Sequence, residues 1–165
     1  MTVSNVTTIM VGLGEVKISK DPELVLACLG LGSCVAISVF GPVAKVGGMA
    51  HVVLPKSNGK TGERASRYAD VAVPMLFERL KEGGAVESRC VVNIAGGAQM
   101  SVALGIGTAF KIGEDNIAAI HAALKAKGLK PKAADTGGRK GRTVRLFIET
   151  GKTMVSSAGN ESREL

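Results

Sequence analysis

Hydrophobic and polar residues alternate over much of the first half of the chain, which predicts β-strands. The clearest alternation covers residues 35–40, and residues 46–54 are strand-like again. Gly41 and Pro42 form a turn signal between them, so the two segments predict a β-hairpin. Short strands are also predicted at residues 7–11 and 16–18, and a short apolar run covers residues 25–29.

The register of this hairpin places a cysteine opposite a histidine. In an antiparallel pair the two residue numbers add up to a constant, and a turn centred between Pro42 and Val43 makes that constant 85. Cys34 and His51 satisfy it, which predicts that their Cβ atoms lie ~4.5–5.5 Å apart. A bulge at Gly47–Gly48 would shift the pairing by one residue.

The pattern changes to helical spacing at two places further along the chain. A helix is predicted from about Arg67 to Lys81, where Pro74 either kinks it or opens a shorter helix. A second helix is predicted between Glu114 and Gly128. The other segments predict a strand at residues 90–95, a glycine-rich loop at 96–112, a turn at 135–138 and a final hairpin of residues 142–149 and 152–155.

These elements predict the α/β class, specifically an α+β sandwich with a largely antiparallel sheet and two main helices. The length of 165 residues suits one domain, and the contents of 45% hydrophobic and 21% charged residues are typical of globular proteins. We therefore expect a single domain over residues 1–156 and a polar, frayed tail over residues 157–165.

The charge balance narrows the class of partner. The net charge is +7, and most of the basic excess falls in the last third of the chain. A positive electrostatic field of this size favours acidic partners. A solvated basic face nevertheless explains the excess of basic residues more simply than nucleic-acid binding does. Aromatic residues make up only 3% of the chain and tryptophan is absent, so no surface for stacking bases is expected. We predict no nucleic-acid partner.

The cysteine count and the absence of targeting signals indicate a reducing cytoplasm. Three cysteines without paired spacing do not form a disulfide framework, and Cys90 is predicted to be an inert core thiol. Residues 1–11 do not resemble a signal peptide, and no apolar run approaches the ~18–20 residues of a membrane span. With two histidines and no C-x-x-C motif, we expect no metal site and no cofactor.

Cys34 is the strongest candidate nucleophile. It follows a small-residue segment in which the backbone N–H groups of Gly32 and Ser33 are candidates for binding an oxyanion. His51 is placed to take the thiol proton, because the thiolate is the reactive form. On the pattern alone we favour a plainer interpretation, in which Cys34 is a small buried residue and His51 is a hydrogen-bonded core histidine.

A family resemblance favours the catalytic interpretation of Cys34 and His51 over the plainer one. Residues 29–35 and 47–55 resemble the CheD family of chemoreceptor glutamine deamidases. Shorter stretches extend the resemblance from about Val11 to Val155. They are residues 67–70, 94–98, 112–113 with Asn116, 135–138 and 149–151. The resemblance implies hydrolysis of receptor glutamine side chains to glutamate, without a cofactor. Cys34 would be the nucleophile of a Cys–His–Thr triad and His51 its base, with a thioester intermediate.

The chain departs from this family at the third member of the triad. The family threonine stands six residues before the cysteine, and here that residue is Cys28. A thiol is a poor hydrogen-bond acceptor, so three interpretations remain open. A backbone carbonyl orients His51, or Cys28 is sufficient, or the activity is reduced.

The resemblance also implies a fold and partners. The fold would resemble the catalytic domain of deamidating bacterial toxins. The partners would be the cytoplasmic domains of chemoreceptors and the chemotaxis phosphatase CheC, for which Met100 or Val102 would supply an apolar anchor. Two other classes stay open. One is a non-catalytic adaptor for receptors or CheC, and the other is a redox sensor with a disulfide between Cys28 and Cys34.

Overall fold

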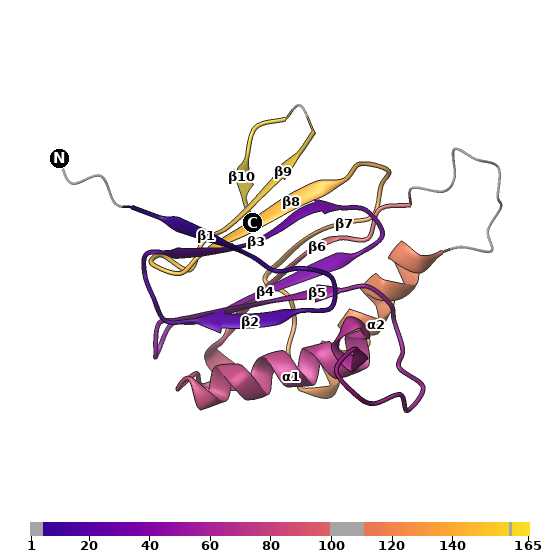
Figure 1. Ribbon diagram of the computed structural model, residues 1–165, viewed down its shortest axis with the longest axis horizontal. Helices are drawn as coiled ribbons and strands as arrows, with labels where there is room; N and C mark the ends of the chain where they lie inside the picture. Colours follow the sequence, from indigo (N-terminus) through magenta and orange to yellow (C-terminus); the bar gives the residue numbers. More distant parts are fainter. Residues whose placement is uncertain (1–4, 100–110, 159) are drawn as a thin grey trace.

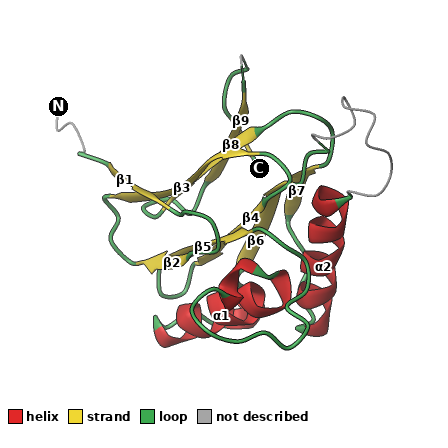
Figure 2. Ribbon diagram, turned by 45° about the vertical axis from the view of Figure 1, so that its right-hand side comes forward, coloured by secondary structure: helices red, strands yellow, loops and turns green. Residues whose placement is uncertain are grey.

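The chain folds into three layers. The computed structural model describes residues 5–99, 111–158 and 160–165. Two five-stranded sheets stack on each other, and both α-helices cover the free face of one of them (Figures 1 and 2). We call the sheet against the helices the central sheet and the other the outer sheet.

Each sheet mixes strands from distant parts of the chain. The outer sheet has the order β1 (Thr7–Met10), β3 (Leu24–Leu31), β8 (Arg142–Phe147), β9 (Thr153–Ser157), β10 (Arg163–Glu164). The central sheet has the order β2 (Val16–Ser19), β5 (Val46–Val52), β4 (Val35–Gly41), β6 (Val91–Gly96), β7 (Ala133–Thr136). The helices are α1 (Ala69–Glu82) and α2 (Ile112–Ala126), and 3₁₀ turns lie at Ala65–Arg67 and Glu87–Arg89.

Strand β4 separates two hydrophobic cores because alternate side chains point to opposite faces of a sheet. Val35, Ile37 and Val39 pack towards the helices, where Phe77 is fully buried. Ala36 belongs to the second core, which fills the space between the two sheets. Fully burying a side chain such as Phe77 stabilises the fold by roughly 1.5–3 kcal/mol.

The mixed α/β class and the two main helices are confirmed. Most strand pairs are antiparallel, but the strands form two stacked sheets rather than one. Residues 135–136 end strand β7, so the turn predicted at 135–138 begins later, at Gly137. Pro74 lies inside α1 instead of starting a helix.

The predicted hairpin of β4 and β5 is present, but its register was wrong by two residues. Ala36, not Cys34, lies opposite His51. The ladder is regular from Val35 to Gly41, and the turn at residues 42–45, with Lys45 at φ of 53°, is centred one residue later than predicted. An error of two residues keeps each side chain on its face, so Cys34 precedes β4 on the side of the sheet that carries His51.

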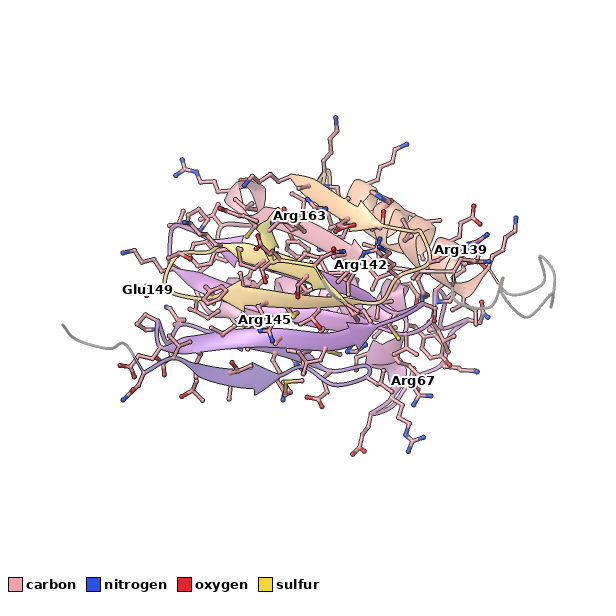
Figure 3. The ribbon with its side chains drawn as sticks, turned by 90° about the horizontal axis from the view of Figure 1, so that it is seen from above. Arg67, Arg139, Arg142, Arg145, Glu149 and Arg163 are labelled. Atoms are coloured by element: carbon pink, nitrogen blue, oxygen red, sulfur yellow. The ribbon has the colours of Figure 1, made fainter. Side chains whose placement is uncertain are left out.

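Residues 163–165 pair with strand β9 of the outer sheet, which corrects the expectation of a frayed tail. Arg163 lies opposite Val155, and the Leu165 N–H donates to the Thr153 carbonyl at 2.9 Å. Arg163 also reaches across to β7, where its guanidinium lies 2.7 Å from the Asp135 carboxylate. Figure 3, seen from the side of the outer sheet, shows Arg163 close to Arg142, which pairs with the same carboxylate.

Within the described parts of the chain, neither α-helix is long and apolar enough to cross a bilayer.

Candidate active site

Residues 32–34, which we call the nucleophile loop after the candidate Cys34, are held in place through their carbonyl groups. The Gly32 carbonyl accepts a hydrogen bond from Ala98 N–H at 2.8 Å, and the Cys34 carbonyl accepts one from Gly97 N–H at 2.9 Å. The Ser33 carbonyl accepts one from the Asn116 side chain at 3.0 Å. The backbone N–H groups of these three loop residues donate to no acceptor in the described part of the chain. The loop therefore fixes its carbonyls and leaves its donors for another group.

The end of β6 reaches this loop because residue 96 is a glycine. Gly96 has φ of 120°, a conformation that side-chain-bearing residues rarely adopt. A Cβ atom at this position would collide with the Cys34 carbonyl. The backbone of β6 thus approaches the nucleophile loop more closely than a residue with a side chain at position 96 would allow.

His51 is buried near the end of β5. Its side chain lies on β5 and is 6% exposed. The ring Nδ1 is 2.9 Å from the Val11 carbonyl oxygen, in the segment that follows β1. A carbonyl only accepts hydrogen bonds, so Nδ1 carries the proton and Nε2 is the basic nitrogen of the neutral ring.

Cys28 lies at the same carbonyl. Its Sγ is 3.6 Å from the Val11 oxygen and 3.5 Å from Met49 Sδ, and the residue is fully buried. Burial, together with the nearby charges of Cys34 and Glu15, raises the pKa of the Cys28 thiol to about 12. Of the three interpretations for orienting His51, the geometry supports the backbone carbonyl. Cys28 reaches that carbonyl rather than the imidazole.

Cys34 is partly exposed and packs against the core between the sheets, which includes Cys28, Ala36 and Met49. Burial raises the pKa of the Cys34 thiol above its ordinary value. The unassisted thiol is therefore protonated at neutral pH, and a reaction at Cys34 needs a base. Because Ala36 faces His51, Cys34 lies diagonally from His51, two residues before Ala36 and on the same face.

The remaining predicted residues lie elsewhere. Cys90 precedes β6 instead of lying in a strand, and its Sγ contacts the Val86 carbonyl at 3.4 Å. Burial and the charge of Glu87 raise the pKa of its thiol. Met100 and Val102 lie outside the described residues. In the described ranges, no group of three or more His, Cys, Asp or Glu side chains is arranged to hold a metal ion.

Two contributors to the site were not predicted as site residues from the sequence, although Asn116 belongs to the family resemblance. Val11 acts through its main-chain oxygen, which no side-chain motif reveals. Asn116 left a usable signal, because it shares a helical face with Ile120 and Leu124 at intervals of four residues and is buried with them. A polar residue in an apolar stripe indicates a specific hydrogen-bonding task.

Comparison with known proteins gives consistent similarities. The family described as "CheD chemotactic sensory transduction" matches residues 53–157. A "chemoreceptor glutamine deamidase CheD" of Thermotoga maritima is 47% identical over 91% of this chain and 92% of its own. A "probable chemoreceptor glutamine deamidase CheD" of Symbiobacterium thermophilum is 43% identical over 94% and 95%.

A similar probable deamidase of Archaeoglobus fulgidus is 40% identical over 93% of this chain and 96% of its own. Among solved structures, a hypothetical protein of Bacillus licheniformis, YfiH, overlays with a TM-score of 0.47. It is 12% identical and covers 81% of this chain and 60% of that chain, which says nothing about function.

Proposed function

Because the chain belongs to the CheD family, we propose that it hydrolyses glutamine side chains of chemoreceptors to glutamate. Cys34 is the nucleophile and His51 is the general base. The observation that carries the catalytic assignment is the Val11 carbonyl at His51 Nδ1, because it leaves Nε2 as the basic nitrogen. The names of the relatives supply the substrate class.

The reaction begins with transfer of the Cys34 thiol proton to His51 Nε2. The sulfur attacks the carboxamide carbon of the glutamine, and the carbonyl oxygen becomes an oxyanion. The backbone N–H groups of Gly32 and Ser33, which have no acceptor among the described residues, are the donors we assign to this oxyanion. The imidazolium returns its proton to the departing nitrogen, ammonia leaves, and a thioester to Cys34 remains.

The second half of the reaction regenerates the thiol. His51 takes a proton from water, and the hydroxide attacks the thioester carbon. The carbon–sulfur bond breaks, the sulfur recovers the proton from His51, and glutamate is released. Every proton moves through one imidazole, so the fixed tautomer of His51 serves both steps.

Cys28 takes no part in proton transfer in this scheme. The Val11 carbonyl orients the imidazole, and Cys28 fills the position of the family threonine beside it. We do not favour a redox pair between Cys28 and Cys34, because the raised pKa of the buried Cys28 thiol makes it a poor attacking group in disulfide formation. We infer a cytoplasmic location from the cytoplasmic receptor domains that the enzyme would modify, and CheC binding stays a prediction.

Alkylation of Cys34 by iodoacetamide distinguishes this enzyme from an adaptor that only binds receptors. Cys90 is an internal control, since it is also partly buried and its pKa is also raised by burial. We expect Cys34 to react at least about 10-fold faster than Cys90 at pH 7.5, and His51→Ala to remove the difference. Equal rates at the two cysteines, unchanged in His51→Ala, would support the adaptor instead.

A further inference from the structure

One buried polar side chain on α2 has no place in the scheme above. Asn116 is completely buried, and its helical face is otherwise apolar through Ile120 and Leu124. An apolar side chain of similar volume would pack at this position without burying polar atoms. The asparagine therefore needs an explanation from the bonds it makes.

The Asn116 amide joins two segments of the candidate site. Its Nδ2 donates to the Ser33 carbonyl and to the Val53 carbonyl, each at 3.0 Å. Both partners are carbonyl oxygens, so only the NH₂ group of the amide can face them. Ser33 is the residue before Cys34, and Val53 follows His51 by two residues. One NH₂ group thus connects the nucleophile loop to the end of the strand that carries the base.

This arrangement has an energetic cost. The Asn116 Oδ1 is buried and has no hydrogen-bond partner in the described part of the chain. An unpaired buried oxygen destabilises a fold. The side chain does not touch substrate either, because it is fully buried and both of its N–H groups are used by backbone carbonyls.

Helix α2 is itself held firmly against the nucleophile loop. Gly113, one turn before Asn116, packs so closely on the Gly97 carbonyl that a Cβ atom there would lie 2.5 Å from it. Gly97 in turn donates to the Cys34 carbonyl. The amide of Asn116 therefore projects from a helix whose distance to Cys34 is already set.

We propose that Asn116 is a positioning residue that sets the separation of Cys34 and His51 by holding the Ser33 and Val53 carbonyls at one amide group. This inference rests on the proposed deamidase function. Its consequence is that loss of the amide displaces the nucleophile from the base without altering the substrate surface. A small misplacement of reacting groups lowers the rate of the chemical step strongly.

The test replaces Asn116 with leucine, which has a similar size and no donor. Asn93 offers a matched control, because it is also buried and its Oδ1 also has no partner among the described residues, but it lies on β6 opposite Ser38, away from the nucleophile loop. For each variant we would measure kcat and KM on a chemoreceptor cytoplasmic fragment, the melting temperature and the rate of Cys34 alkylation. Asn116→Gln, which keeps the NH₂ donors, is the conservative variant.

We expect Asn116→Leu to lower kcat about 10–100-fold and to slow Cys34 alkylation, with KM changed less than about twofold. Asn93→Leu should leave kcat within about threefold, and Asn116→Gln should retain more kcat than Asn116→Leu when rates are corrected for the folded fraction. A kcat of Asn116→Leu equal to that of Asn93→Leu, or no advantage of glutamine, would overturn the positioning role. A wild-type protein that leaves the receptor unmodified would instead overturn the proposed function.

Discussion

The Val11 carbonyl oxygen is the atom on which the candidate site depends most. It holds Nδ1 of His51 at 2.9 Å and lies 3.6 Å from the Cys28 sulfur. A main-chain oxygen orients the imidazole as a carboxylate or hydroxyl does in other triads, because each accepts the Nδ1 proton. The departure from the family pattern at Cys28 therefore does not remove the orienting group.

Replacing Cys28 with threonine tests this conclusion. We expect Cys28→Thr to keep kcat/KM for a receptor fragment within about threefold of wild type, or to raise it, because the bond from His51 to Val11 is unaffected. A threonine hydroxyl is also a stronger hydrogen-bond donor than the thiol beside the same oxygen. A loss of deamidation larger than about 10-fold in a folded Cys28→Thr protein would show that the thiol itself takes part.

Side chains that carry chemistry could be nominated from the sequence. The pattern alone favoured a buried cysteine at Cys34 and a core histidine at His51, and the resemblance to the CheD family made the two residues the candidate pair. The Val11 carbonyl has no such signal, because every residue has a carbonyl group. The hydrogen bonds of Asn116 join residues 83 and 63 positions away in the chain, which no local pattern encodes.

The strands show which part of the geometry a periodic pattern determines. The alternation along β4 separated its two faces correctly, and the register error of two residues left Cys34 on the face that carries Ala36. The turn at residues 42–45 is centred one residue later than predicted and has Lys45 at φ of 53°, a conformation that is uncommon for lysine and was not expected. Strand faces were thus predictable and the exact pairing was not.

Strand β6 makes its own contribution through Gly96. Gly96→Ala should place a methyl group against the Cys34 carbonyl and force the nucleophile loop to move. Gly59→Ala is the matched control, because Gly59 also has a positive φ, of 80°, but has open space around it. The control should lose about 1 kcal/mol of unfolding free energy from the backbone alone.

We expect Gly96→Ala to lose at least about 2 kcal/mol of unfolding free energy, measured by chemical denaturation, and most of its activity. The backbone strain at a positive φ and the collision with the Cys34 carbonyl both contribute to this loss. Equal stability and activity of the two variants would mean that the close approach of β6 to Cys34 does not matter for the site.

The stacking of two sheets on one pair of helices places the site at the end of the layer between the sheets. The core of that layer joins β3 and β8, and Leu26 pairs with Leu146 across 120 positions of sequence. Tertiary packing determines such long-range pairing, and local patterns do not encode it. For this reason the sequence predicted one sheet, whereas the structure has two. The three layers bring Val11, Cys28, Cys34 and His51 together from β3, β5 and the ends of β1 and β4.

The most direct test of the central claim uses the whole protein and its substrate class. A chemoreceptor cytoplasmic fragment would be incubated with wild-type protein and with Cys34→Ala, and its glutamines followed by peptide mass spectrometry. Conversion of specific glutamines to glutamate by the wild type, and none by Cys34→Ala, is the predicted result. Conversion by both proteins, or by neither while the fragment is bound, would contradict a deamidase that acts through Cys34.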